Sequence, residues 1–206
     1  MRNIFAKAAL LALAFSLPLS AHAEVTEKSD AGFVTSASAE VAGKTPMQVW
    51  QALIAPQKWW NKLHSWSGDS ANMFLDAQAG GCFCELLPLD KAAPEGVRRG
   101  SVEHARVISA MPGKMLRMSG GFGPLQAEAM QGVLTVQLKA NKQGTTISWI
   151  YIIGGYMRIK PDDIAPMVDK VMGEQLTRLA EFAANEPDVG SAGKDKELPD
   201  APKPHQ

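Results

Sequence analysis

Cysteine is scarce in this chain, with only Cys82 and Cys84 among 206 residues. One pair cannot supply the disulfide framework of a small secreted scaffold, so a hydrophobic core has to hold the fold. An excess of either charge is also missing, because 21 basic residues face 21 acidic ones and no nucleic-acid-binding motif accompanies them. No apolar run reaches the ~20 residues that a helix needs to cross a bilayer, so the sequence predicts neither a nucleic-acid partner nor a transmembrane segment.

Signatures of catalysis are missing as well. The sequence contains no G-x-S-x-G elbow, no H-E-x-x-H and no Walker glycines. The glycine-rich segment 120–124 lies between two expected strands, so no helix N-terminus follows it to receive a phosphate. It is expected to be a flexible connection at the border of a cavity. The sequence therefore indicates no cofactor and favours a protein without enzymatic activity.

The first residues are typical of a signal peptide. Arg2 and Lys7 introduce an apolar run over residues 8–19, which is followed by small residues that end at Ala23. Cleavage is expected after Ala23, so residues 1–23 would be removed and the mature protein would be periplasmic or secreted.

The remaining chain divides into three parts. Residues 24–31 are polar and are expected to form a flexible linker, and residues 185–206, rich in proline and charge, a disordered tail. Residues 32–184 have the length of a single domain.

Alternating apolar residues predict seven strands in this domain. They are expected at residues 33–41, 72–76, 82–87, 101–108, 115–119, 130–139 and 145–153. Thr45 and Pro46 predict the capped start of a helix over residues 46–54, and Pro56 starts a second short helix that runs to Leu63.

One long amphipathic helix follows the strands. Its apolar face carries Ile164, Met167, Val168, Val171, Met172, Leu176, Leu179 and Ala183. So broad a face has to be buried, and the inner face of the preceding antiparallel sheet is the available partner. The expected fold is therefore α+β: a curved antiparallel sheet wrapped around a long C-terminal helix, with two short helices after the first strand.

The order of these signals resembles the START-like helix-grip superfamily (SRPBCC). The residues that carry the resemblance are the capped helix near a tryptophan pair, Gly80-Gly81, Gly100, Pro112 in a turn, and Gly144-Thr145 before the long helix. The superfamily includes polyketide cyclase-like proteins, pollen-allergen-like proteins and relatives of the chaperone ATPase activator. The resemblance covers roughly residues 32–184 and implies a hydrophobic cavity between the sheet and the terminal helix, in which most members bind apolar small molecules. It implies no catalytic residues, and export argues against a co-chaperone role.

Cys82 and Cys84 are two residues apart on an expected strand. Their side chains then point the same way, with Cα atoms ~6.6 Å apart, near the upper limit for a disulfide. A bulge at Gly80-Gly81 would allow a redox pair, or a soft-metal site completed by His64, His104 or a methionine. The spacing favours small buried residues that line the core over either alternative, so no metal is expected.

His104 and Arg106 share one face of the strand expected at residues 101–108. If that face points inward, the two side chains would orient the polar end of a ligand whose body lies on apolar walls. If it points outward, they reach water at an edge or at the mouth of the cavity. The alternation leaves both possibilities open.

The cavity hypothesis also gives expectations for two adjacent tryptophans and one tyrosine. Trp59 and Trp60 lie about 100° apart on a helix, so one of them is expected at a rim. Tyr151 shares an apolar inner face with Trp149 and needs a hydrogen-bond partner, which would be a ligand, a neighbouring side chain or water.

The leading hypothesis is a soluble exported protein that binds an apolar or amphipathic small molecule. The candidate ligand-binding residues are Trp66, Cys84, His104, Arg106, Met118, Phe122, Trp149, Tyr151, Met172 and Leu176. One alternative is a cyclase, lyase or hydrolase that uses the same cavity, with an acid, base or oxyanion-stabilising group among His104, Arg106, Glu103 and Glu128. Another is a periplasmic metal or redox protein based on the two cysteines.

Overall fold

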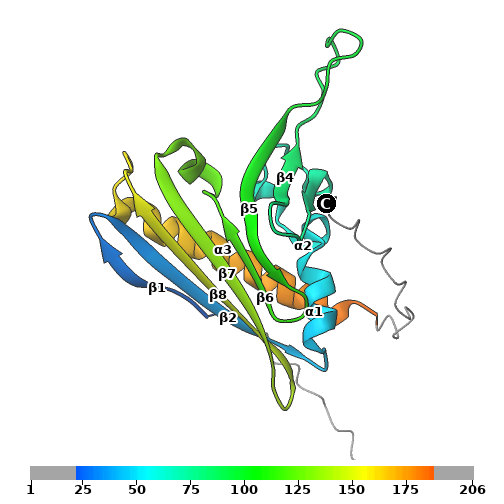
Figure 1. The fold of residues 1–206 in the computed structure, drawn as a ribbon, viewed down its shortest axis with the longest axis vertical. Helices are drawn as coiled ribbons and strands as arrows, with labels where there is room; N and C mark the ends of the chain where they lie inside the picture. The colour runs from blue at the N-terminus through cyan, green and yellow to red at the C-terminus, as the bar shows by residue number, and fades with distance from the viewer. Residues whose placement is uncertain (1–21, 188–206) are drawn as a thin grey trace, which may run out of the picture.

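A single curved sheet of eight antiparallel strands forms the body of the protein (Figure 1). The computed structural model describes residues 22–187. The strands lie in the order β1-β2-β8-β7-β6-β5-β4-β3. Their bounds are β1 (His22–Ser29), β2 (Gly32–Ala42), β3 (Met73–Leu75), β4 (Cys82–Leu86), β5 (Ser101–Met111), β6 (Met115–Ser119), β7 (Met130–Ala140) and β8 (Gly144–Gly155). All seven predicted strands are present, and β1 is an eighth.

The helices lie where proline and capping signals place them. They are α1 (Pro46–Leu53), α2 (Pro56–Trp59) and α3 (Pro161–Asn185), with the 3₁₀ turns η1 (Lys62–His64), η2 (Ser70–Asn72) and η3 (Gly123–Ala127). Thr45 caps α1 because its hydroxyl accepts the backbone N–H of Gln48, whose side chain returns to the backbone N–H of Thr45. The α+β class and the two early helices are therefore confirmed, but the second helix is shorter than predicted. It ends at Trp59, and the chain up to Leu63 continues through Trp60, which is extended, into the 3₁₀ turn η1.

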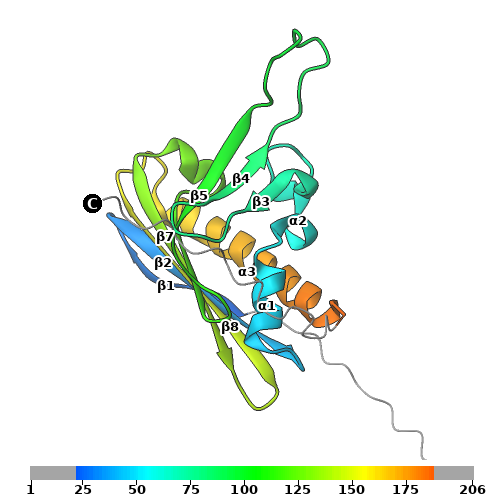
Figure 2. The same ribbon diagram turned by 45° about the vertical axis from the view of Figure 1, so that its right-hand side comes forward.

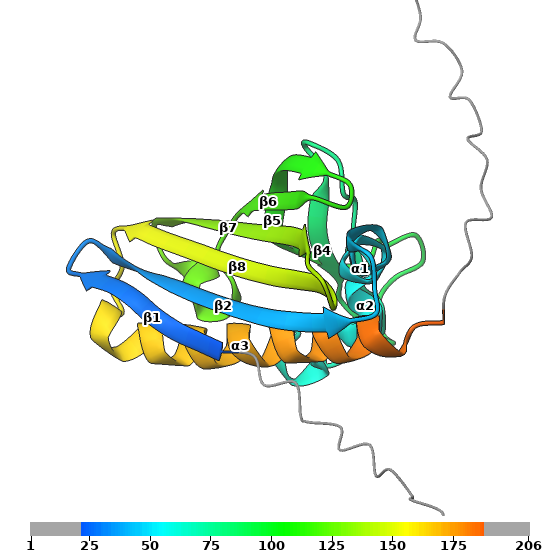
Figure 3. The ribbon, with the colours of Figure 1, turned by 90° about the horizontal axis from the view of Figure 1, so that it is seen from below.

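Helix α3 lies across the concave side of the sheet, against β2 and β1 (Figure 3). Its buried residues extend from Ile164 to Ala183, as the apolar periodicity predicts. Gly173 permits the close approach of β1, since a Cβ atom at this position would lie 2.7 Å from the Cβ of Ala23. This arrangement is compatible with a helix-grip fold. Within residues 22–187, no helix combines the length and the apolar composition that a membrane span requires.

The flexible linker expected at residues 24–31 is wrong. Most of this segment belongs to β1, which pairs with β2 and has a bulge between Val25 and Glu27. Ala23 and Val25 pack against the core, whereas the side chains at 24 and 26–29 are exposed. An edge strand with so few buried residues has the polar composition of a linker, which is why the sequence misleads here.

The predicted ends of the chain are only partly described. Residues 1–21 of the expected signal peptide lie outside the described residues, and the expected cleavage position after Ala23 falls inside β1. The expected tail begins at Asn185, which is the last residue of α3, and its residues 188–206 lie outside the described part.

The connection between β4 and β5 projects from the sheet as a long arm (Figure 2). Leu87 and Gly100 close its base, because the N–H of Leu87 donates to the carbonyl of Gly100 at 2.8 Å. Arg99 strengthens the base by donating to the carbonyls of Leu86 and Leu87. The strands on either side of the arm, β4 and β5, carry the polar part of the site described below.

Candidate functional site

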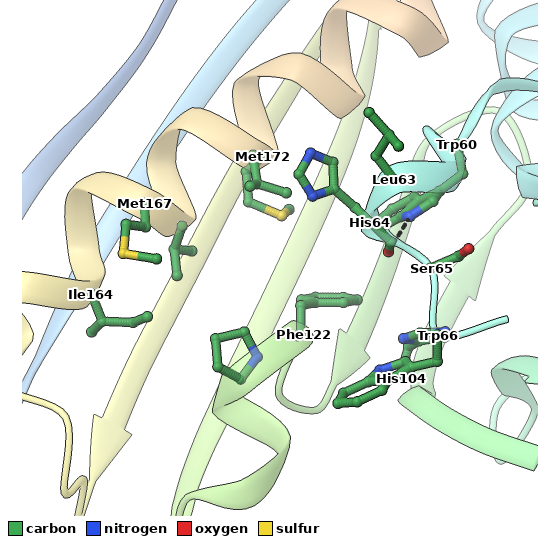
Figure 4. Close-up of a pocket in the computed structure, with 14 residues that line it drawn as sticks. Trp60, Leu63, His64, Ser65, Trp66, His104, Phe122, Ile164, Met167 and Met172 are labelled. Atoms are coloured by element: carbon green, nitrogen blue, oxygen red, sulfur yellow. Dashed lines mark hydrogen bonds between the residues drawn. The ribbon is translucent and has the colours of Figure 1, made fainter. Parts of the chain in front are cut away.

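A pocket of about 480 Å³ opens beside the N-terminal half of α3 (Figure 4). Its walls come from α3, from the segment after α2, from the beginning of η3 and from β5. The lining residues are Trp60, Leu63, His64, Ser65, Trp66, His104, Phe122, Gly123, Pro124, Ile164, Met167, Val168, Val171 and Met172. The volume lies in the range of small-molecule sites, which is roughly 300–1,000 Å³.

Large apolar side chains are exposed around this opening. Leu63 is 80%, Trp66 57% and Met167 58% exposed, although all three are apolar or aromatic. Single exposed apolar residues are normal on protein surfaces, but here three of them line one pocket and form an apolar rim. Figure 4 shows Met167 on α3, with Leu63 and Trp66 on the segment across the pocket from it.

His104 reaches the pocket because β5 contains a bulge. Phe83 pairs with Ala105 and Cys84 with Glu103, so His104 is an extra residue between these two pairs. His104 and Ala105 are both buried, whereas Glu103 and Arg106 are exposed. The bulge thus reverses the alternation within the strand, and neither of the two simple alternations considered for residues 101–108 is correct.

A buried glutamate holds the imidazole of His104. The Nε2 atom of His104 lies 3.0 Å from Oε2 of Glu85, with the two side chains 3% and 0% exposed. The same carboxylate accepts the backbone N–H groups of Trp66 at 3.0 Å and Ser67 at 2.5 Å. Glu85 therefore connects β5 to the segment at the rim of the pocket.

The hydrogen bonds assign the proton of His104. A carboxylate only accepts, so Nε2 carries the hydrogen and Nδ1 is left as an acceptor. The side-chain amide of Gln126 lies 3.4 Å from Nδ1, which is a long contact. His104 thus keeps one weakly engaged acceptor beside the pocket that it lines.

Both members of the pair have shifted pKa values. Burial lowers the pKa of His104, and the hydrogen bond and charge of Glu85 offset this only in part. For Glu85, burial alone would raise the pKa, but the hydrogen bonds from Ser67, Trp66 and His104 together lower it. The pair is therefore a neutral imidazole next to a carboxylate at neutral pH.

The segment that forms one wall is fastened to α3 by polar contacts. The side-chain amide of Asn61 donates to Glu174, and His64 Nε2 lies 3.3 Å from the same carboxylate. The backbone N–H of Asn61 donates to Gln175 at 2.9 Å. The hydrogen bond from Asn61 is the main cause that lowers the pKa of Glu174. These contacts hold Leu63 and its neighbours against the pocket.

Tyr151 supports the pocket from behind and does not line it. Its hydroxyl donates to the carbonyl of Gly120 at 2.8 Å and accepts the N–H of Phe122 at 3.4 Å. Its ring packs edge-on against Phe122, with centroids 5.2 Å apart. Burial raises the pKa of Tyr151, so the hydroxyl keeps its proton. The hydrogen-bond partner left open by the sequence is the backbone of the 120–122 loop.

The candidate ligand-binding residues separate into two groups. Those that line the pocket are Trp66, His104, Phe122 and Met172. Those that do not are Cys84, Arg106, Met118, Trp149, Tyr151 and Leu176.

The second group has specific alternative positions. Met118 and Trp149 border a small interior void of about 20 Å³, and Leu176 is fully buried in the core. Arg106 faces solvent, where it pairs with Glu103 at 2.6 Å and donates to the carbonyl of Gly80. Arg106 and Glu103 are therefore not available as catalytic groups in the pocket.

The expectation that Trp59 or Trp60 lies at a rim is wrong, because both are buried. Helix α2 ends at Trp59, and Trp60 has an extended backbone, so the 100° rotation between helical neighbours does not apply. Their indole N–H groups donate to the carbonyls of Ala52 and His64, respectively. The rim tryptophan is Trp66.

The two cysteines are also placed differently from the sequence prediction. Cys82 and Cys84 form a disulfide, with Cα atoms 5.4 Å apart, and do not line the core as free thiols. This separation is shorter than the ~6.6 Å expected for residues two apart on an extended strand. The residue whose side chain lies with the sulfur atoms is Glu103, not a histidine, so the metal site considered with His64 or His104 does not match this arrangement.

Sequence reasoning missed several pocket residues. They are Trp60, Leu63, His64, Ser65, Gly123, Pro124, Ile164, Met167, Val168 and Val171, together with the buried Glu85. Met167 and Val171 belong to the apolar face that was predicted for the long helix. This face is broader than the part of the helix that the sheet buries. That excess was the available signal.

Comparisons with known proteins find only distant likenesses to solved structures. No protein family and no curated protein matches the chain. Among solved structures, protein CV1439 from Chromobacterium violaceum has 17% identity and a TM-score of 0.43, covering 74% of this chain and 98% of that chain. An uncharacterised protein from Rhizobium leguminosarum has 19% identity and a TM-score of 0.47, covering 81% and 99%. CalU16 from Micromonospora echinospora has 13% identity and a TM-score of 0.47, covering 77% and 78%. At these TM-scores, the likenesses carry no argument about fold or function.

Proposed function

We propose that this protein is an exported member of the START-like helix-grip superfamily that binds an apolar or amphipathic small molecule in the pocket beside α3. The observation that carries the proposal is a pocket of about 480 Å³ with apolar walls and a histidine, His104, that a buried carboxylate orients. The apolar walls favour a hydrocarbon body. The acceptor on His104 favours a ligand with a hydroxyl or amide donor at one end.

The arrangement of the walls supports a preformed site. Trp60 and Phe122 are buried and pack against Phe83, at centroid distances of 5.3 and 6.1 Å, so this side of the pocket is rigid without a ligand. The opposite side carries the exposed Leu63 and Met167. A bound molecule would cover these side chains. Each Å² of apolar surface that is removed from water in this way favours binding by about 25 cal/mol.

A pair of tryptophan substitutions on α3 tests the proposal. Val171→Trp fills the pocket, whereas Lys170→Trp adds the same side chain at a neighbouring exposed position outside it. Protein purified from its own host is analysed by native mass spectrometry for a co-purifying molecule. We expect such a molecule on the wild type and on Lys170→Trp, and its loss from Val171→Trp. Equal retention by both variants, or no binder on the wild type and none among apolar probes, would refute the proposal.

The pair of His104 and Glu85 favours a second candidate, a hydrolase, lyase or cyclase in which His104 is a general base. A histidine held in one tautomer by a buried carboxylate is a common arrangement for that role. Its acceptor, Nδ1, would take a proton from a bound substrate. Turnover of the identified ligand that is lost in a folded His104→Gln variant, while binding remains, would establish this candidate in place of simple binding.

A further inference from the structure

We propose that Cys82 and Cys84 form an exchangeable disulfide that reacts with external dithiols on the outer face of the sheet, separate from the pocket. The two cysteines lie on β4 with Phe83 between them. Phe83 points into the core, where its ring lies 5.2 Å from that of His104. The sulfur atoms lie on the opposite side of the strand, next to Glu103 of β5.

The small loop argues against a role in stability. A disulfide stabilises a fold chiefly by restricting the unfolded chain, and the effect grows with the length of the closed loop. Cys82 and Cys84 are only two positions apart. In addition, β4 is already paired with β3 on one side and β5 on the other. Reduction should therefore leave the fold intact, which a reversible redox pair requires.

The two sulfur atoms differ in access. Cys82 is half-buried near the beginning of β4, whereas Cys84 is only 7% exposed. An incoming thiolate therefore attacks Sγ of Cys82, and Cys84 leaves as a thiolate that takes up a proton. The second thiol of the same dithiol then attacks the dithiol sulfur that is bonded to Cys82. This step closes the cyclic disulfide and releases Cys82 as a thiol. The protein disulfide gains two electrons and two protons, and the dithiol becomes a cyclic disulfide.

Two opposite charges flank the bond. A carboxylate oxygen of Glu103 lies within 4.8 Å of both sulfur atoms. Arg106 pairs directly with Cys82 in the ladder and holds Glu103 at 2.6 Å. A cation stabilises the thiolates that attack and leave, whereas a carboxylate opposes them. Arg106 and Glu103 should therefore change the exchange rate in opposite directions.

The first experiment measures reduction of the folded protein by dithiothreitol, followed by alkylation and mass spectrometry. We expect two thiols to become alkylated at a rate proportional to the dithiothreitol concentration, with the thermal unfolding midpoint nearly unchanged and full reoxidation by oxidised dithiothreitol. A rate that does not depend on dithiothreitol would mean that reduction waits for unfolding, and would overturn the proposal. Loss of the folded state on reduction would do the same.

Charge variants then test whether Glu103 and Arg106 control the rate of disulfide exchange. Glu103→Gln should accelerate reduction several-fold and Arg106→Gln should slow it by a similar factor. Arg117→Gln on the neighbouring strand β6, whose side chain bonds to Thr135, is the matched control and should react like the wild type. Identical rates in all three variants would overturn the roles of Glu103 and Arg106.

Single-cysteine variants test the order of attack. Cys84→Ser leaves Cys82 as a free thiol, and Cys82→Ser leaves Cys84. We expect a disulfide reagent such as 5,5′-dithiobis(2-nitrobenzoate) to label Cys82 at least about tenfold faster than Cys84 in the folded protein. Faster labelling of Cys84 would contradict the mechanism. Ligand binding in the pocket is not required for any of these outcomes, so they stand apart from the proposed function.

Discussion

The carboxylate of Glu85 and the imidazole of His104 form a buried hydrogen-bonded pair across β4 and β5, with Nε2 and Oε2 3.0 Å apart. Because Glu85 also accepts the N–H groups of Trp66 and Ser67, it fixes one side of the opening. Its removal should therefore affect both stability and the rim.

Glu85→Ala should destabilise the protein strongly. The substitution leaves the N–H groups of Trp66 and Ser67 and the Nε2–H of His104 without their acceptor. A loss of about 3 kcal/mol in the free energy of unfolding is expected, measured by urea denaturation. Glu103→Gln, at an exposed ion pair, is the control and should cost less than about 0.5 kcal/mol. Similar losses in the two variants would contradict the role of Glu85.

Stability should fall on mild acidification. Burial lowers the pKa of His104 in the folded state, so the folded protein binds this proton less tightly than the unfolded chain, whose pKa is about 6.5. The stabilisation is complete above about pH 6.5 and is lost as the pH falls through the folded-state pKa of His104. The contribution of Glu85, whose pKa is also lowered, persists to more acidic pH.

The histidine variants distinguish this effect from general acid sensitivity. His104→Gln should flatten the dependence of the unfolding free energy on pH below about pH 6.5, whereas His64→Gln, at the pocket wall, should retain it. The measurement is urea denaturation at several pH values. An unchanged slope in His104→Gln would show that another group causes the acid sensitivity.

Gly132→Ala should disturb the wall of the pocket from a distance. A Cβ atom at Gly132 would lie 2.6 Å from the hydroxyl oxygen of Tyr151 and would clash with the carbonyl of Gly120. Overpacking of this kind costs about 1–3 kcal/mol, and here it also displaces the loop that carries Phe122. Gly154→Ala is the control, because its nearest neighbour lies at 3.6 Å. The comparison uses thermal unfolding together with ligand binding, and equal effects would disprove the packing argument.

The first strand should contribute to stability although its sequence looks like a linker. A chain that begins at Gly32 lacks the pairing of residues 24–29 with β2 and the contact of Val25 with the core. We expect its unfolding temperature to fall by roughly 4–8 °C relative to a chain that begins at Glu24, which corresponds to ~2 kcal/mol in a domain of this size. Equal unfolding temperatures would show that residues 24–31 act as a linker after all.

The fold could be predicted from the sequence because its main signals are periodic. The alternation in β7 and β8 marks the face of the sheet that is buried, and the apolar face of α3 marks the surface that packs on it. Proline residues and Thr45 mark where the helices begin. Strand β1 gave no such signal, since among residues 23–29 only Ala23 and Val25 pack against the core.

The site was predictable only in part because it depends on departures from periodicity. His104 was singled out, but the bulge that turns it inward and Arg106 outward leaves no mark in the sequence. Trp60 was misplaced because α2 ends one residue before it. Glu85 is a charged residue in a strand, and its burial follows from donors on Trp66 and Ser67 that only the folded chain brings near.

The order of the sheet leaves two open borders, and each is protected. At one border β3 has only three residues, too few to serve as a template for a foreign strand. At the other, β1 presents charged side chains and the irregular step between Val25 and Glu27. Neither edge strand can therefore pair easily with an edge strand of another molecule. This protects the protein from aggregation through its sheet edges.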